Sequence, residues 1–277
     1  MNAGKMKGPC AFDKLFARNV PHILEMIFFS LDYESFKKCV EVNRAWKEQI
    51  TSMSFQVKAK SMFAKEIQKD QEKLLAVSRE GNVAEARQLL SSGLLNVNYL
   101  FGSLCSTPLM KAASNGSLKL VQFLLNEGAE VNKANNFEDT PLHFAACKGH
   151  KDAVKVLLER GAQPDWENRM HVTPLYLASL KCHKDVVNFL LERGADPNKA
   201  TKEGYTPLHA ASSRRHKDVV KLLLEKGADP NKANKGGNTP LHLASQIAHK
   251  DGIKLLLDAG ADPNKANEDG KTPLDYK

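Results

Sequence analysis

The chain contains few cysteines and no long apolar run. Its five cysteines lie 29, 66, 42 and 35 positions apart: Cys10, Cys39, Cys105, Cys147 and Cys182. This spacing lacks the close pairs that bind zinc, so free thiols in a reducing compartment are expected. The most apolar stretch, Ile23 to Leu31, is short and contains Glu25, which predicts neither a signal peptide nor a membrane span. The sequence indicates a soluble intracellular protein, cytoplasmic, nuclear or both, with no membrane partner.

The chain also has no concentrated charge of one sign. Its 277 residues carry 40 basic and 32 acidic side chains, a net charge of +8. Residues 1–71 contain 12 basic and 8 acidic side chains, and residues 72–277 contain 28 and 24, so each part is at +4. Binding to a phosphate backbone requires a denser Lys/Arg face. No nucleic-acid partner is therefore expected.

One tripeptide recurs with a fixed period. Thr-Pro-Leu begins at six positions that are 33 residues apart: Thr107, Thr140, Thr173, Thr206, Thr239 and Thr272. A Gly-Ala pair has the same period and begins at Gly128, Gly161, Gly194, Gly227 and Gly260. Agreement between two separate registers indicates an array of structural repeats.

Each repeat predicts two helices and a connection. In one unit, Thr206 is placed to cap a helix that begins at Pro207, because proline fits the first helical position. After a turn at residues 214–216, the apolar stripe from Val219 to Leu224 predicts a second helix. Gly227 is expected to end it in the left-handed conformation, and residues 228–237 form a turn-rich connection.

This unit resembles the ankyrin repeat. The family signatures appear as TPLHFAA at 140–146, GHKDAVKVLLERGA at 149–162 and GADPN at 194–198. The resemblance implies an all-α solenoid of helix pairs with β-hairpin fingers and a concave binding surface. The units are 72–104, 105–137, 138–170, 171–203, 204–236, 237–269 and a partial one at 270–277; the first is divergent, with two extra residues in its loop. Three interpretations of the partial last unit remain open: its C-terminus frays, the natural chain is longer, or a partner covers it.

The nine histidines do not predict a catalytic or metal site. Seven of them occupy two 33-residue registers, which assigns them to the framework: His143, His209, His242, His150, His183, His216 and His249. His22 and His171 are isolated. The motifs GxxxxGK[ST], HExxH and GxSxG are absent from the sequence. The prediction is a protein that is not an enzyme and holds no cofactor or metal.

Residues 19–51 do not share the 33-residue period. Apolar side chains from Ile23 to Leu31 fall on one face of a predicted helix, and Asp32 is placed to cap a second. Val42, Trp46 and Ile50 continue an apolar stripe at four-residue steps. Three short helices cannot bury this surface alone, so a partner or docking on the repeats is expected.

This segment resembles an F-box. The matching positions are Pro21, Ile23, Leu24, Ile27, Phe28, Leu31, Asp32, Ser35, Phe36, Cys39, Val42, Arg44 and Trp46. The resemblance implies docking on the Skp adaptor, and through it on a cullin scaffold, by Pro21, Ile23, Leu24, Ile27, Phe28, Leu31, Phe36, Val42 and Trp46. Asn19, Val20 and His22 depart from the family pattern at the adaptor-contacting edge, which leaves adaptor binding open. An N-terminal tail at 1–18 and a rigid helical linker at 52–71 complete the predicted organisation.

Target-binding residues are expected at positions where one repeat differs from the other repeats. Trp166 stands where the other units have lysine, and an exposed tryptophan at a hairpin is predicted to anchor a partner. Neighbouring departures are Phe137, Asp139, Arg169, Met170, Val172 and Tyr205; local repacking of the hairpin explains them equally well. Lys148, Lys181 and Arg214 recur on the inner turn, where they either favour an acidic target or form a solvated basic face.

The two resemblances together predict a substrate-recognition subunit of an SCF-type cullin-RING ubiquitin ligase. The chain would act as a monomer within a larger complex, with the F-box holding the adaptor and the ankyrin array recruiting a protein for ubiquitination. The alternative is an ankyrin scaffold or inhibitor whose first helices only cap the stack. The target is not named by the sequence, because binding surfaces are assembled from several fingers. An endogenous subunit and an effector from a virus or intracellular parasite would use the same modules.

Overall fold

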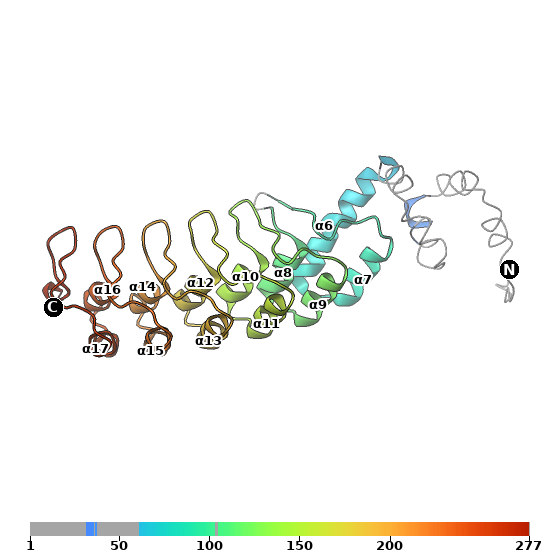
Figure 1. Cartoon of the computed structure of the whole chain (residues 1–277). Coiled ribbons are helices and arrows are strands. Elements are labelled where there is room, and N and C mark those ends of the chain that lie inside the picture. The colour runs from blue at the N-terminus through green and yellow to red at the C-terminus, as the bar shows by residue number, and fades with distance from the viewer. Residues whose placement is uncertain (1–31, 36, 38–60, 103–104, 277) are drawn as a thin grey trace, which may run out of the picture. The chain divides into compact units, whose positions relative to one another are not determined.

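The computed structural model describes residues 32–35, 37, 61–102 and 105–276. Within these ranges every regular element is a helix, as Figure 1 shows. The chain divides into two compact units. The first runs up to Lys73 and includes Arg87–Asn96, and the second comprises Leu74–Ala86 and Val97–Lys277.

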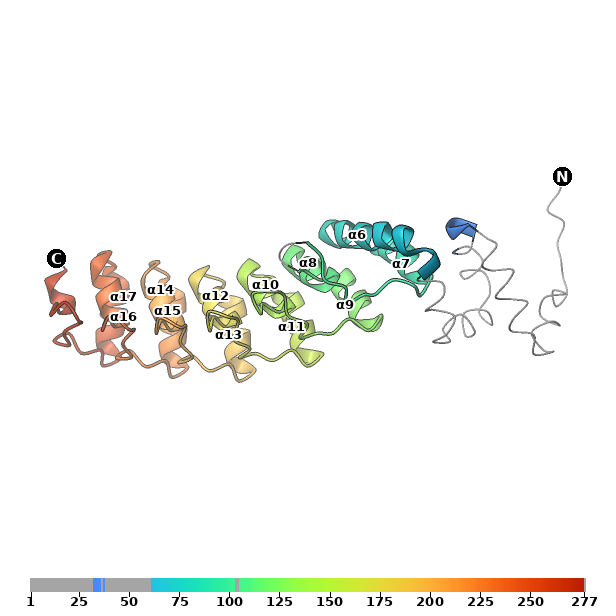
Figure 2. The same cartoon turned by 90° about the horizontal axis from the view of Figure 1, so that it is seen from above.

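The second unit contains two rows of short helices. The inner helices are α8 (Pro108–Asn115), α10 (Pro141–Lys148), α12 (Pro174–Leu180), α14 (Pro207–Ser212) and α16 (Pro240–Gln246). The outer helices are α9 (Leu118–Asn126), α11 (Lys151–Glu159), α13 (Lys184–Glu192), α15 (Lys217–Glu225) and α17 (Lys250–Asp258), and a 3-10 turn, η1 (Pro273–Asp275), follows. Each helix packs on its pair and on the equivalent helix of the next repeat. Figures 1 and 2 show the two rows and the fingers, the connections that project between an outer helix and the next inner helix.

The predicted signals begin and end these helices. The Thr107, Thr173 and Thr206 hydroxyls each accept a hydrogen bond from the third residue of the following helix, at 3.2, 3.2 and 3.3 Å, and proline occupies the first turn. A glycine ends the turn after each outer helix with φ between +85° and +89°: Gly128, Gly161, Gly194, Gly227 and Gly260. Only glycine adopts this conformation at little cost. The sequence prediction of the helix pairs is confirmed.

The core repeats with the same period. Each inner helix buries a leucine, and the outer helices α9, α11, α13 and α15 each bury a valine, as in Leu142, Leu175, Leu208, Val154, Val187 and Val220. Burying such a side chain contributes about 1.5–3 kcal/mol. Because the layer recurs in every unit, stacking of neighbours builds one continuous core.

The described fingers contain no β-strand, and their one β-bridge is the isolated antiparallel pair Phe101 and Ser106. In the finger at 128–139, Asn135 N–H donates to the Asp139 carbonyl at 3.0 Å, and the Asn135 side chain accepts from the Phe137 and Asp139 N–H groups at 2.9 Å. The next finger adds one backbone bond, from Arg169 N–H to the Phe137 carbonyl at 2.9 Å. A ladder requires repeated pairs of such bonds. The strand prediction is wrong because the asparagine side chain satisfies the groups that a second strand would pair.

Two helices precede the regular repeats, α6 (Ala64–Glu80) and α7 (Val83–Ser91). Helix α6 runs through residues 71 and 72, where the sequence places the boundary between linker and array, and this boundary stays a prediction. Gln71, which is 3% exposed, donates to the Asn96 carbonyl at 2.6 Å and accepts from Asn96 N–H at 2.9 Å. These two bonds fix the side chain of α6 to the loop after α7.

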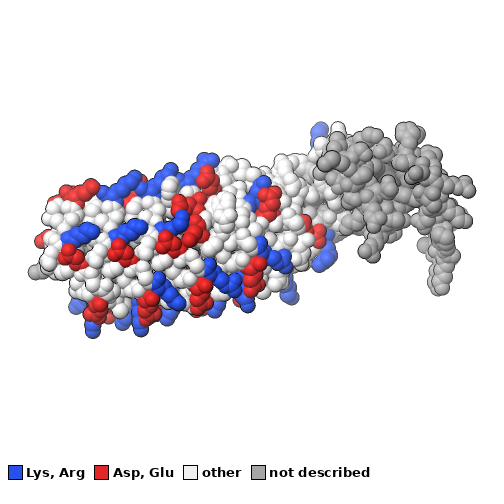
Figure 3. All heavy atoms as spheres, in the orientation of Figure 1, with Lys and Arg blue, Asp and Glu red and all other residues white. Residues whose placement is uncertain are grey.

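Acidic and basic side chains are mixed on the outside of the array. On the face that Figure 3 shows, Lys and Arg lie next to Asp and Glu along successive repeats. Ion pairs such as Lys217–Asp251, at 3.3 Å, join neighbouring outer helices. This face offers no extended area of one sign.

Candidate protein-binding surface

Histidines of the Thr-Pro-Leu-His segments connect consecutive repeats. His143 accepts from Thr140 N–H at Nδ1, at 3.1 Å, and lies 3.0 Å from the Val172 carbonyl through Nε2. A carbonyl only accepts, so Nε2 carries the proton of a neutral ring. His209 repeats this arrangement. Burial lowers the pKa of His143 and brings the pKa of His209 to about 4. Both are framework residues, as the sequence predicts.

A second histidine register lies at the start of the outer helices. His150 and His183 donate from Nε2 to carbonyls of the preceding repeat at 3.0 Å, and their rings rest on the backbone of Gly116 and Gly149. Arg215 occupies the equivalent glycine position at a φ of +60°. His249, which would lie against it, packs on Gly252 instead, and its buried Nδ1 has no hydrogen bond within the described residues.

Asparagines connect the bases of successive fingers. Asn132 donates to the Gly161 carbonyl at 3.0 Å and accepts from Gln163 N–H at 3.1 Å. Asn198 and Asn231 make the same two bonds to the following finger. An amide can do this because it donates and accepts at once.

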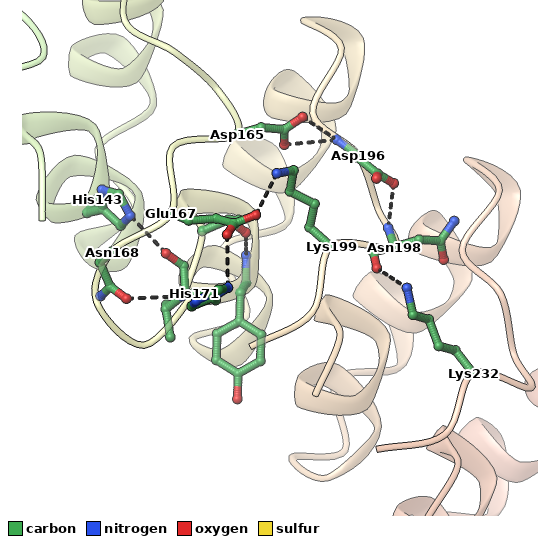
Figure 4. Close-up of polar contacts among 12 residues, drawn as sticks. His143, Asp165, Glu167, Asn168, His171, Asp196, Asn198, Lys199 and Lys232 are labelled. Carbon is green, nitrogen blue, oxygen red and sulfur yellow. Dashed lines mark hydrogen bonds and ion pairs between the residues drawn. The ribbon is translucent and has the colours of Figure 1, made fainter. Parts of the chain in front are cut away.

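Asp165 interrupts this series. Its carboxylate accepts from Asp196 N–H at 3.0 and 3.2 Å, as Figure 4 shows. A carboxylate has no hydrogen to donate, so the bond to the Gly194 carbonyl that an asparagine would make is missing. Burial raises the pKa of Asp165, while Asp196 N–H and the Lys199 charge oppose the shift.

We expect Asp165→Asn to raise the free energy of unfolding by about 1 kcal/mol, because it restores one hydrogen bond between repeats. Urea denaturation of the full chain measures the change. The reverse substitution in a regular finger, Asn198→Asp, is the control and should lower stability by a similar amount. Equal or reduced stability of Asp165→Asn would contradict the role assigned to this series.

The same finger contains a charged cluster that the sequence analysis did not identify. Glu167 stands where the other fingers have Ala134, Ala200, Ala233 and Ala266. Its carboxylate contacts Lys199 Nζ at 2.5 Å and His171 Nδ1 at 3.1 Å (Figure 4). In regular fingers the lysine instead donates to a backbone carbonyl of the preceding finger, as Lys232 does to the Asn198 carbonyl at 2.7 Å. Comparison of the repeats within the sequence could have found this departure.

The structure separates the predicted finger residues into two groups. Phe137 and Met170 are exposed, with 52% and 54% of their surface accessible. Trp166 is half-buried and its indole N–H donates to the Glu138 carbonyl at 3.1 Å, so the prediction that it is exposed is wrong. Arg169 is exposed and pairs with Glu138 at 3.6 Å.

The remaining finger residues have structural contacts. Asp139 accepts from the Asn168 side chain at 2.7 Å, and Val172 provides the carbonyl that His143 binds. The Tyr205 ring lies edge-on to His209, with 5.8 Å between ring centres.

Tyr176 takes the position that histidine fills in other repeats, and sequence analysis did not single it out. Burial raises the pKa of its phenol and the neighbouring Tyr205 adds to this, while the Arg214 charge opposes it. Tyr176, Tyr205 and Arg214 therefore share one electrostatic environment.

The three predicted cations of the inner turn are all exposed. Lys148 is the last residue of α10, Lys181 follows α12, and Arg214 lies two residues beyond α14. We call Lys148, Lys181 and Arg214 the basic row. None of the ion pairs among the described residues includes a member of it.

A family model of ankyrin repeats matches residues 109–201 and 196–267, more than half of the chain. The chain belongs to the ankyrin-repeat family. It is also similar to the crystal structure of the human ASB11 ankyrin repeat domain, with 31% sequence identity and a TM-score of 0.67, over 73% of this chain and 90% of that one. No curated protein matches the sequence.

The ankyrin-repeat fold is a protein-interaction scaffold, and its array here is a protein-binding domain. The part of the chain that the structure describes contains no cluster of His, Cys, Asp and Glu suited to a metal ion. Its helices include none that is long and apolar enough to cross a membrane. Cys105, Cys147 and Cys182 are free thiols.

The predicted F-box contacts lie outside the described residues, so the structure does not place them: Pro21, Ile23, Leu24, Ile27, Phe28, Leu31, Phe36, Val42 and Trp46. Only residues 32–35 and 37 of this segment are described, and Tyr33, Glu34 and Ser35 are helical there. Asp32 accepts from Ser35 N–H at 2.8 Å, which is the helix cap that the sequence predicts.

Proposed function

We propose that this protein is the non-enzymatic substrate-recognition subunit of an SCF-type cullin-RING ubiquitin ligase. In this proposal residues 19–51 dock on the Skp adaptor and the ankyrin array recruits a target protein for ubiquitination. The observation that carries it is the presence in one chain of an ankyrin array and a preceding F-box-like pattern. The ligase works in the cytoplasm and nucleus, where the proposal places this protein.

Two structural features support a recruiting role for the array. Exposed side chains in successive repeats, including Phe137, Met170 and the basic row, are available to a partner. Helix α6 contains both the second half of the predicted linker and the first helix of the array. A continuous helix suits a receptor that must hold its target at a set distance from the ubiquitin-loading arm.

We expect Leu31→Ala or Trp46→Ala to weaken binding of the purified Skp adaptor by tenfold or more, because buried apolar anchors dominate such interfaces. Trp166→Ala, in the array, should leave adaptor binding unchanged. Size-exclusion chromatography of the full chain with the adaptor, followed by titration, measures both. Full adaptor binding by the first two variants would exclude the F-box assignment, provided that circular dichroism shows all three variants folded.

A second candidate is an ankyrin scaffold whose N-terminal helices only support the stack. It is favoured by contacts on Asp70 of α6, which accepts from Tyr33 at 3.0 Å and pairs with Lys37 at 2.7 Å. Tyr33 also lies 5.3 Å from the Phe63 ring, centre to centre. Under this alternative, deleting residues 1–51 lowers the melting temperature of the array and the intact chain does not co-elute with Skp.

A further inference from the structure

The inner helices carry charge of one sign only. None of the five contains an aspartate or glutamate, whereas α8 and α10 contain Lys111 and Lys148, and Lys181 and Arg214 follow the next two. The outer helices differ, because α11, α13 and α15 each begin with a Lys-Asp pair whose charges cancel. The excess positive charge of the array is therefore found at the inner helices.

Acidic side chains of the fingers do not neutralise this charge. Glu138 pairs with Arg169, Glu167 with Lys199 and His171, and Glu203 with Lys235 at 3.7 Å. These three finger glutamates thus already have basic partners on the fingers. The three members of the basic row are exposed and have no acidic partner among the residues described.

The neighbourhood of the row suits a carboxylate ligand. Tyr176 and Tyr205 are both half-buried, and the Arg214 charge opposes the rise in the Tyr176 pKa that burial and Tyr205 cause. Burial, and after it the charge of Arg79, lowers the pKa of the Lys111 amine on α8. Asn115 and Ile247 occupy the row position in the repeats before and after, so the basic row spans three central repeats.

We propose that the basic row binds an acidic, extended segment of the partner protein. This inference rests on the proposed function of the array as a target-binding domain and gives that target a chemistry. Neighbouring helices pack about 10 Å apart, and an extended chain in the polyproline II conformation has three residues per turn and advances about 3.1 Å per residue. Successive members of the row therefore face every third residue of the segment, so the matching pattern is Asp or Glu at positions i, i+3 and i+6.

The test is binding of two fluorescent nine-residue peptides of equal composition to the full-length chain. One has glutamates at positions 1, 4 and 7, and the other has three adjacent glutamates. We expect the spaced peptide to bind at least fivefold more tightly. The triple variant Lys148→Gln, Lys181→Gln, Arg214→Gln should weaken it tenfold or more. The matched control, Lys155→Gln, Lys221→Gln, Lys254→Gln, removes the same charge from exposed positions of the outer helices and should change affinity less than twofold.

Several outcomes would overturn the inference. The first is that the spaced peptide does not bind. The second is an equal loss of peptide affinity in the two triple variants. The third is that a single-stranded RNA binds more tightly than the peptide and that this binding is lost in the inner-turn variant only. Skp co-elution is measured in parallel, because the triple variant leaves residues 19–51 unchanged. Adaptor binding without peptide binding removes this inference alone, whereas peptide binding without adaptor binding removes the ligase assignment and leaves the acidic target in place.

Discussion

Between pH 6.5 and pH 4, the array is expected to lose about 3 kcal/mol of unfolding free energy through His209 alone. Burial lowers the pKa of this side chain from 6.5 to about 4 in the folded state. The unfolded chain therefore binds more protons within this window, and stability rises with pH. The contribution is fully present above pH 6.5 and is lost as the pH falls toward 4, because the ring takes up a proton in the unfolded chain and stays neutral in the folded one. Urea denaturation at a series of pH values measures the slope.

His209→Met separates this effect from the titration of carboxylates. Methionine is a native occupant of the same position in the first Thr-Pro-Leu repeat, where Met110 Sδ accepts from Thr107 N–H at 3.4 Å. The variant loses the bond to the Asn238 carbonyl and should be less stable at neutral pH, but its pH dependence should be flatter by about 3 kcal/mol. His171→Asn, at an exposed position, is the control. An unchanged slope in His209→Met would contradict the assignment.

Gly149→Ala is expected to destabilise the array by about 3 kcal/mol, for two reasons that add. Its φ of +76° is left-handed, which costs an alanine about 1–2 kcal/mol. A Cβ atom there would also overlap the His183 ring. The ring would have to shift, which weakens its 3.0 Å bond to the Cys147 carbonyl and adds a loss of about 1 kcal/mol.

Gly161→Ala provides the matched control. Its φ is +89°, but an added Cβ would meet no atom within 4 Å, so only the backbone cost of about 1–2 kcal/mol is expected. The double variant Gly149→Ala, His183→Ala has no ring to overlap, so its loss should be smaller than the sum of the losses in Gly149→Ala and in His183→Ala alone. Chemical denaturation of the four proteins tests the difference, and equal losses for the two glycine variants would show that the ring does not matter.

In two later repeats, a larger side chain occupies the position equivalent to Gly149. Cys182 and Arg215 stand in the same register at φ values of +62° and +60°. After Cys182 the next histidine, His216, keeps its carbonyl bond, at 3.2 Å. After Arg215, His249 has moved onto Gly252 with a buried Nδ1 that lacks a hydrogen bond in the described structure. We infer that the larger side chain displaces the ring.

The helix pairs could be predicted from sequence because their signals are local. A Thr-Pro pair fixes the start of a helix, and a Gly-Ala pair fixes its end, within a few residues of chain. The start of the array could not be predicted in this way. No proline or glycine lies between Met53 and Glu80, and the bond that joins α6 to the loop after α7 is between Gln71 and Asn96, 25 residues apart.

The binding surface was only partly predictable, because single substitutions act through neighbouring repeats. Trp166 was expected to be exposed, yet the Glu138 carbonyl of the preceding finger captures its N–H group. Asp165 has a carboxylate where asparagine has an amide. The consequence for hydrogen bonding is seen only in the contacts with Gly194 and Asp196 of the next finger. The basic row was correctly expected to be exposed, since a regular turn repeats its environment in each unit.

The bonds between repeats also bear on how the chain folds during synthesis. His150 donates to a carbonyl 36 residues before it, and His143 donates to one 29 residues after it. A repeat that has left the ribosome therefore has hydrogen-bond donors and acceptors without partners until the next repeat has been synthesised. We therefore expect the hydrogen bonds between repeats to form in the order in which the repeats are translated.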